Sequence, residues 1–318
     1  MTNRMTEGNP LKLILTFALP LLGGNLFQQL YNIADAAIVG KFLGSNALAS
    51  VGASSSIQFL VLGFCIGICC GFAIPVAQRF GAKDLKEMRS YIFHSYLMTL
   101  FFAVFLTAAC VICCHGILHL LKTPKNIYGN AYRYLLIIFF GIPFTLLYNL
   151  LAGMLRAIGD SRTPFFLLVC STILNIGLDL LFILVFGWGC AGAAIATISA
   201  QGISGILCLL VIIKRFPILN LKKADLVYQG QKMKTLTTMG IPMGLQYSIT
   251  AIGSMVMQSA NNGLGSVYVS GFTAAMRIKQ FAMCPFDALA TAVSTFVSQN
   301  YGAGRFDRIK KGIKQGIT

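Results

Sequence analysis

Three acidic residues lie inside apolar stretches that are long enough to cross a membrane: Asp35, Asp179 and Asp287. A charged side chain in a bilayer is costly unless it faces a partner or a water-filled cavity, so each is a candidate functional residue. Asn175 precedes Asp179 by one helical turn and shares its helix face. At about 1.5 Å of rise per residue, Asp35, Asp179 and Thr197 all lie roughly 8–9 Å from the same face of the bilayer core.

Two carboxylates, an amide and a hydroxyl at one depth form an oxygen-rich set that suits a proton or a hard cation such as Na⁺. We therefore predict a cation-coupling site for H⁺ or Na⁺, with no other cofactor or metal. The alternative is a polar network that only joins packed helices.

The first apolar stretch carries a polar stripe that ends at Asp35. Asn25, Gln28 and Asn32 precede this aspartate at intervals of three or four residues, so they share one face of a helix. Pro20 interrupts the same stretch and leaves the carbonyl of the residue one turn earlier without its N–H donor. We expect the helix to rearrange about this proline when an ion binds, and thereby to displace the transported compound.

The stretch over residues 236–262 carries polar side chains at helical spacing but no acid. Asp287 lies in the next stretch and could either contribute to a cavity or neutralise Arg277 or Lys279. The residues expected to line a cavity or to act as a hinge are Pro20, Asn25, Gln28, Asn32, Gln246, Gln258 and Asp287.

Composition places these residues in a membrane protein. The 318 residues are 56% hydrophobic and only 11% charged, and their mean hydropathy is +0.75, whereas a soluble domain has about 25% charged residues. The net charge of +16 does not indicate nucleic-acid binding, because the basic residues lie between apolar stretches. Eight membrane helices are expected, over residues 12–38, 46–77, 91–118, 131–155, 164–187, 191–213, 236–262 and 267–299.

Lys and Arg gather in alternate loops, which sets the predicted orientation. The other loops hold only Lys41, Lys122, Lys125 and Arg133. The positive-inside rule therefore predicts a multi-pass protein of the cell membrane with its N-terminus in the cytoplasm. The lipid bilayer is the expected environment, and neither nucleic acid nor an obligate protein partner is indicated.

An internal repeat at an offset of 221 residues divides the chain. The segment Gln78-x-x-Gly81-Ala82 recurs as Gln299-x-x-Gly302-Ala303, and a basic stretch follows each copy. Six helices separate the copies, so both enter the membrane from the same side, as parallel repeats. We predict an N-lobe over residues 1–215, a basic cytoplasmic linker over 216–235, and a partial C-lobe over 236–318 with two helices and the start of a third. Because the second copy is incomplete, we expect the chain to be a fragment.

The chain resembles the MATE family of multidrug and toxic compound extrusion transporters, on its DinF-like branch. The resemblance rests on the opening segment from Pro20 to Gly44, on the repeated Gln-x-x-Gly-Ala motif, and on Leu155-Arg156-Ala157-x-Gly159-Asp160-x-Arg162-x-Pro164. It implies an all-α polytopic fold of two pseudosymmetric six-helix lobes, of which this chain has the first lobe and two helices of the second.

The resemblance also implies an N-lobe cation site with an aspartate in the first helix, Asn-x-x-x-Asp in the fifth and a threonine in the sixth. The matching residues are Asp35, Asn175, Asp179 and Thr197. Some family members use an acid in the seventh helix, which this chain lacks, so coupling is expected in the N-lobe.

The predicted function is a secondary active antiporter that exports small, often cationic organic compounds in exchange for inward H⁺ or Na⁺. A flippase for a lipid-linked precursor is the alternative within the same architecture, and a passive channel is a further one. A membrane-embedded enzyme is not expected, because only the region Cys110–His119 offers residues for a metal or a catalytic dyad. The phosphate-binding motif of ATP-driven transport is also absent from the sequence.

Overall fold

The computed structural model describes residues 4–120, 123–262 and 266–317, which form helices and connecting turns without strands. The N-lobe contains α1 (Pro10–Leu43), α2 (Ser45–Gly81), α3 (Leu85–Leu120), α4 (Lys125–Phe140), α5 (Ile142–Ala157), α6 (Arg162–Leu180), the π-helical turn η1 (Leu181–Val185) and α7 (Gly189–Arg215). The short 3-10 turns η2 (Pro217–Leu219) and η3 (Lys223–Asp225) lead to the C-lobe helices α8 (Gly230–Asn262), α9 (Ser266–Gly302) and α10 (Phe306–Ile317).

The helices confirm the predicted all-α polytopic fold. Among the described residues, six helices are long and apolar enough to cross a membrane, and the bent pair α4–α5 would make a seventh. The bend of 44° falls at Gly141, where a Cβ atom would lie 2.2 Å from the Ile198 side chain. The remaining predicted span, α8, is long but more polar, because residues such as Gln246 and Thr250 interrupt its apolar surface.

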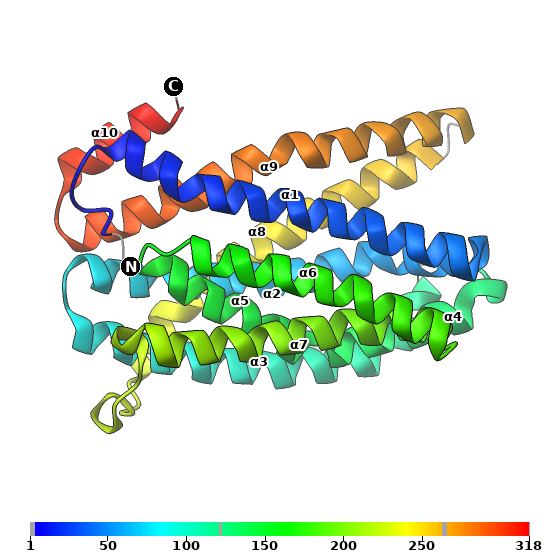
Figure 1. Ribbon diagram of the computed structural model, residues 1–318, viewed down its shortest axis with the longest axis horizontal. Coiled ribbons are helices and arrows are strands. Elements are labelled where there is room, and N and C mark those ends of the chain that lie inside the picture. The colour runs from blue at the N-terminus through cyan, green and yellow to red at the C-terminus, as the bar shows by residue number, and fades with distance from the viewer. Residues whose placement is uncertain (1–3, 121–122, 263–265, 318) are drawn as a thin grey trace.

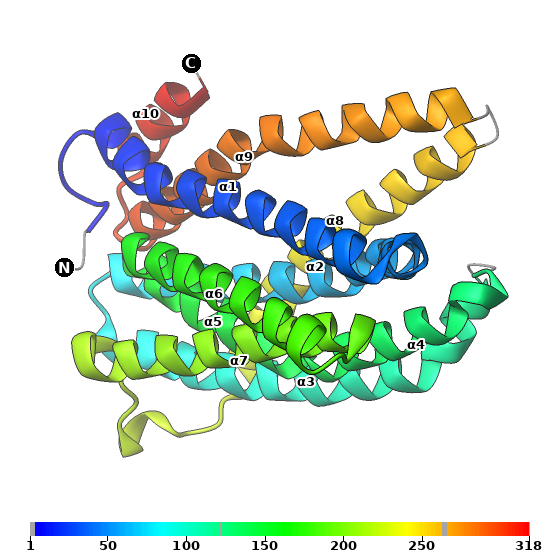
Figure 2. The ribbon, with the colours of Figure 1, turned by 45° about the vertical axis from the view of Figure 1, so that its right-hand side comes forward.

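The helices lie side by side along one axis (Figure 1), and α2 packs against both α5 and α8. We call the end that holds the α2–α3 turn, the α9–α10 turn and the linker the basic end. Figure 2 shows that α8 and α9 lie against α1 and α2 near this end and diverge from them toward the opposite end. The two lobes are therefore in contact at the basic end and apart at the other.

Glycines allow this close contact between α2 and α8. A Cβ atom at Gly71 would lie 2.6 Å from the Gly240 Cα, and one at Gly67 would lie 2.5 Å from the Met243 carbonyl oxygen. Small residues let membrane helices approach until their backbones touch. At Gly67 and Gly71 the α2–α8 contact between the lobes is therefore made backbone to backbone.

The predicted repeat is visible in two matching turns. After α2, the N–H groups of Ala82 and Lys83 donate to the carbonyls of Gln78 and Phe80, and after α9 the corresponding groups of Ala303 and Gly304 repeat this pattern. Lys83 has φ of 61° and Gly304 has φ of 68°, so both occupy the left-handed conformation that commonly ends a helix.

The two turns also meet each other reciprocally. A Cβ atom at Gly81 would lie 1.9 Å from the Gln299 carbonyl oxygen, and one at Gly302 would lie 1.8 Å from the Gln78 carbonyl oxygen. Each lobe thus presents the same glycine to the same backbone group of the other, which is the contact expected of a two-fold axis. We call these four residues the reciprocal seam.

The linker between the lobes and the first turn of α8 are each fixed to the start of α3 by an ion pair. Arg89 contacts Asp225 at 2.8 Å, and Lys232 contacts Glu87 at 3.0 Å. Burial alone would raise the pKa of Asp225, but the Lys222 backbone N–H and the Arg89 guanidinium outweigh it and hold this pKa below its usual value. The carboxylate of Asp225 therefore stays ionised and keeps the linker on α3.

Candidate ion-coupling site and the cavity between the lobes

Asp35 on α1 and Asp179 on α6 lie close enough for their carboxyl groups to interact electrostatically. Asp179 is fully buried and Asp35 is half-buried. One oxygen of each carboxyl group, Oδ1, is buried without a hydrogen-bond partner among the described residues. Two neighbouring carboxyl groups can share one proton between them.

Asn175 connects this pair to α7. With the amide oriented to satisfy its hydrogen bonds, Nδ2 donates to Asp179 Oδ2 at 2.9 Å and Oδ1 accepts from the Thr197 backbone N–H at 3.2 Å. Asn175 and Asp179 thus lie one turn apart on one face of α6, as their spacing predicts. The amide holds the Asp179 carboxyl group in a defined position.

The Thr197 hydroxyl is tied to its own helix and to α1. Its Oγ1 donates to the Ala193 carbonyl at 3.1 Å, and it lies 3.2 Å from the Tyr31 hydroxyl. Because the single hydroxyl proton of Thr197 is used within α7, Tyr31 must be the donor in the second bond. The structure therefore places Asp35, Asn175, Asp179 and Thr197 together, and their role in coupling remains a prediction.

Two tyrosines at this site were missed by the sequence analysis. Tyr31 lies one turn before Asp35 on the same face of α1, so the helical spacing could have revealed it. Tyr134 on α4 is buried and close enough to interact electrostatically with both Asp35 and Asp179. No local pattern links α4 to α1 and α6, so only the fold reveals Tyr134.

The rest of the α1 stripe has separate surroundings. Asn25 donates from Nδ2 to the Cys284 carbonyl on α9 at 3.3 Å and so joins the two lobes. Gln28 is half-buried and Asn32 is exposed. Pro20 lies inside a continuous α1, where a hinge remains a prediction.

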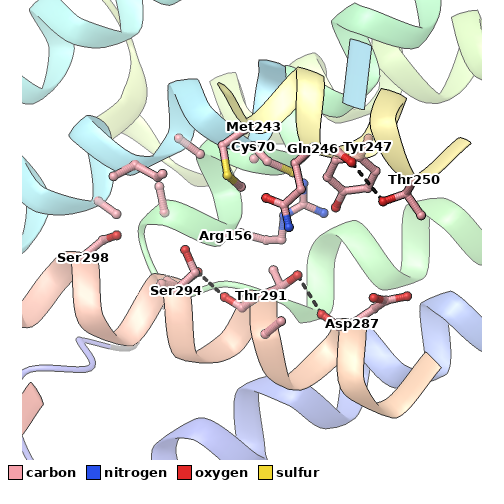
Figure 3. A pocket seen from close by; sticks show the side chains of 17 residues that line it. Cys70, Arg156, Met243, Gln246, Tyr247, Thr250, Asp287, Thr291, Ser294 and Ser298 are labelled. Atoms are coloured by element: carbon pink, nitrogen blue, oxygen red, sulfur yellow. Dashed lines mark hydrogen bonds between the residues drawn. The ribbon is translucent and has the colours of Figure 1, made fainter. Parts of the chain in front are cut away.

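A second feature is a cavity of about 270 Å³ between the lobes (Figure 3). Helices α2 and α5 form its N-lobe wall, and α8 and α9 form its C-lobe wall. Gln246 and Asp287 are among the residues that line it, and Asn25, Gln28 and Asn32 are not. The side chains of Gln258 and Arg277 lie outside the described part of the chain, so their predicted roles are not addressed.

The fourth expected span ended at residue 155 and so left Arg156 just outside it, which the structure corrects. Arg156 lies in the last turn of α5 and points into the cavity beside Gln246 (Figure 3). A basic residue near the end of a span can extend inward as well as outward, so its position in the sequence did not distinguish the two directions. Asp287 makes no ion pair with Lys279 within the described residues.

The residues singled out near Cys110–His119 have packing partners. His115 hydrogen-bonds to Tyr128 and contacts the ring of Tyr132 edge-on, and Cys114 is fully buried. Within the described residues there is no group of three or more His, Cys, Asp or Glu side chains arranged for a metal ion.

At the basic end, a short N-terminal segment joins the lobes. The Met5 N–H donates to Gln299 Oε1 at 2.9 Å, and Gln299 Nε2 donates to the Ala157 carbonyl at 2.8 Å. The Met5 carbonyl accepts from Asn300 Nδ2 at 3.1 Å and from Arg308 at 3.3 Å. Gln299 thus connects the N-terminal segment, α5 and α9 directly beside the reciprocal seam.

Taken together, the fold and the site define a polytopic helical membrane protein with one complete lobe, part of a pseudosymmetric second lobe, a carboxyl pair between α1 and α6, and a cavity between the lobes. The model of the MatE family matches residues 20–181 and 242–318. The chain therefore belongs to the MatE family.

Relatives and solved structures agree with this assignment. The chain is 35% identical over 308 residues to the probable multidrug resistance protein YpnP of Bacillus subtilis, covering 96% of this chain and 68% of that protein. It is 26% identical to DNA damage-inducible protein F of Escherichia coli, covering 90% of this chain and 62% of that protein. A MOP superfamily transporter from Pyrococcus furiosus superposes with a TM-score of 0.93 at 25% identity, covering 99% of this chain and 70% of that one. The chain thus spans about two thirds of the length of these relatives.

Proposed function

We propose that this chain belongs to a secondary active antiporter that exports small organic compounds from the cell in exchange for an inward-moving cation. The observation that carries the proposal is the buried Asp35–Asp179 pair, because two carboxyl groups inside a membrane bundle are costly without an ion to bind. The names of relatives, such as that of YpnP, support export of drug-like compounds.

The proposed coupling ion is H⁺. The two carboxyl groups lie close enough to interact electrostatically, and such a pair is suited to one shared proton. Na⁺ could use the unpartnered oxygens of Asp35 and Asp179, but it needs several further oxygen ligands to complete its coordination. A proton needs no further ligands.

In the proposed cycle, the basic end faces the cytoplasm and the lobes open toward the outside, as the divergence of α8 and α9 from α1 and α2 suggests. A proton from outside binds the Asp35–Asp179 pair and removes the negative charge from the contact between α1 and α6. The change alters the packing of α1, which also contacts α9 through Asn25 and Cys284. In this way the ion site is linked to the C-lobe wall of the cavity.

Transport by protein reconstituted in liposomes tests this proposal. Imposing a pH gradient should drive uphill movement of a fluorescent organic cation, whereas a sodium gradient alone should not. Asp35→Asn should abolish the pH-driven component, because an amide cannot bind and release a proton at this site.

The matched control is Asp84→Asn, which makes the same chemical change in the α2–α3 turn, outside the spans. It should leave gradient-driven transport close to that of the parent. Undiminished pH-driven transport by Asp35→Asn would refute the coupling role of this residue. Transport driven by a sodium gradient alone would show that the coupling ion is Na⁺ and not H⁺.

A further inference from the structure

A buried histidine at the basic end holds the segment that leads from the linker into α8, and the ion-coupling site does not use it. His94 lies in the third turn of α3 and has no exposed surface. Both of its ring nitrogens have partners. Nδ1 lies 2.7 Å from the Ser90 carbonyl oxygen, and Nε2 lies 2.8 Å from the Gln229 backbone nitrogen.

These two partners fix the protonation state of the ring. A carbonyl oxygen can only accept a hydrogen bond, so Nδ1 carries a hydrogen and donates it to Ser90. A backbone N–H can only donate, so Nε2 carries no hydrogen and accepts from Gln229. The contact therefore requires a neutral imidazole with its hydrogen on Nδ1.

A second proton on the ring would break the contact with the linker. A hydrogen on Nε2 would face the Gln229 N–H, so two donors would meet and the hydrogen bond would be lost. The new positive charge would also lie close to the buried Lys232 ammonium, which donates at 2.7 Å to the hydroxyl of Ser90, the residue whose carbonyl binds His94. Protonation of His94 and binding of Gln229 thus exclude each other.

Histidine is the side chain that ordinarily changes charge between about pH 5 and 8, and the carboxylates nearby are ion-paired. The Lys222 N–H and the Arg89 guanidinium hold the pKa of Asp225 below its usual value, so this carboxylate stays ionised. The charged and titratable side chains at this contact are Arg79 on α2, Glu87, Arg89 and Tyr91 on α3, Asp225 and Tyr228 in the linker, and Lys232 on α8.

The histidine acts on a short segment between two anchors. Asp225 is attached to Arg89 on one side of it, and Lys232 is attached to Glu87 on the other. Between these anchors, the three residues that precede Gln229 expose half or more of their surface: Leu226 50%, Val227 58% and Tyr228 66%. The bond from Gln229 to His94 is therefore a main attachment of the segment, and its loss would free the segment while its ends stay in place.

From these contacts we propose that His94 and Gln229 form an acid-sensitive latch. At neutral pH the uncharged His94 holds the segment that leads into α8, and a proton from the solution at the basic end opens it. Because α8 forms part of the cavity wall, the latch fixes the start of a helix that lines the cavity. The inference rests on the proposed function only for its setting, since an antiporter that takes up H⁺ would release it at this end.

Hydrogen exchange of the Gln229 amide, in the purified chain in detergent, tests the latch without requiring transport. Mass spectrometry with fragmentation to single residues gives a protection factor, which relates the measured rate to the intrinsic rate at the same pH. Between about pH 7.5 and about pH 5.5 this factor should fall at least about tenfold, because opening is linked to uptake of one proton. The Lys222 amide donates to Asp225 Oδ2 at 2.9 Å and should keep its protection, because Asp225 stays ionised.

Substitutions assign the response to His94. His94→Gln should give the same protection of Gln229 at both pH values, because an amide oxygen accepts a hydrogen bond without titrating. His94→Leu should leave Gln229 unprotected at both. His115→Gln is the matched control, because His115 bonds to Tyr128 near the opposite end of α3, and this variant should respond as the parent does. Glu87→Gln should respond likewise.

A second measurement needs no substitution. The chain contains three histidines, so the spectrum of ¹⁵N-histidine-labelled protein is simple. One ring should show the Nδ1–H tautomer at the higher pH and become doubly protonated with the midpoint seen for Gln229 exchange.

Three results would overturn the proposal: equal protection of Gln229 at both pH values, a parallel loss at Lys222, or a parent-like response in His94→Gln. A latch that opens with acid in a chain that no ion gradient drives would remove the antiporter and leave the latch. Proton-driven export without any response at Gln229 would do the reverse.

Discussion

At the scale of single residues, Asn175 positions the Asp179 carboxyl group of the pair by linking it to α7. Its amide gives one hydrogen bond to Asp179 and accepts one from the backbone of α7, so it fixes a carboxyl group that would otherwise repel its neighbour. The oxygen Oδ1 of Asp179 remains free to bind an ion. Asp179 thus has one carboxyl oxygen, Oδ2, held by Asn175 and one, Oδ1, available to bind an ion.

Asn175→Ala should therefore destabilise the protein, because Asp179 loses its amide donor while it stays buried. The expected cost is about 1–3 kcal/mol, seen as a lower melting temperature of the detergent-solubilised protein. Asn149→Ala is the matched control, since the Asn149 amide donates to Thr145 within its own helix, and its effect should be smaller. An equal loss in both variants would contradict the bridging role of Asn175.

At the scale of elements, the turns that follow α2 and α9 have the same backbone conformation but different residue types. Both reverse the chain through one residue in the left-handed conformation, which is Lys83 in the first lobe and Gly304 in the second. Glycine adopts this conformation without strain, whereas a lysine has a Cβ atom that crowds the following carbonyl. The first turn is therefore the more strained of the two.

Exchanging the residue types at these positions should shift stability in opposite directions. Lys83→Gly should stabilise the protein by about 0.5–1 kcal/mol, and Gly304→Ala should destabilise it by about 1 kcal/mol. Both positions have space around them: Lys83 is exposed, and a Cβ atom at Gly304 would have no neighbour within 4 Å. The melting temperatures of both variants measure the effect, and a fall for Lys83→Gly would show that the lysine side chain has a stabilising contact.

At the scale of the whole molecule, the lobes make their close backbone contacts near the basic end and diverge toward the opposite end. The reciprocal seam, the α2–α8 glycines and the Gln299 bonds to Met5 and Ala157 all lie in the half of the molecule toward the basic end. The cavity lies between the same helices. Under the proposed function, opening toward the cytoplasm must break the reciprocal seam.

Gly302→Ala should favour that opening, because its Cβ atom would overlap the Gln78 carbonyl and neither group is a flexible side chain. Cys70 lines the cavity, so it should react faster with a water-soluble maleimide in a variant whose other cysteines are serine. Gly116→Ala, where a Cβ atom has no neighbour within 4 Å, is the control. Equal labelling rates in the two variants would show that the seam does not seal this end.

The sequence predicted most of this arrangement for identifiable physical reasons. Hydropathy located the helices, the cost of burying charge identified Asp35 and Asp179, and the repeat identified the matching turns. Tyr134 and the inward direction of Arg156 could not be predicted, because both depend on which helices become neighbours and not on spacing within one helix. That α8 crosses the membrane remains a prediction, because its polar residues, two of which, Gln246 and Thr250, line the cavity, keep it from the set of sufficiently apolar helices.

The reciprocal seam has a consequence for the origin of the protein. A contact in which Gly81 meets the Gln299 backbone and Gly302 meets the Gln78 backbone is isologous, so a single sequence suffices to make both halves of it. Two copies of an unfused ancestral lobe could have closed on each other through this same contact, as a symmetric homodimer. Gene duplication and fusion would then have preserved the glycine and its partner in each half, while the polar residues of α1 and α8 were free to diverge into an acidic and an uncharged version.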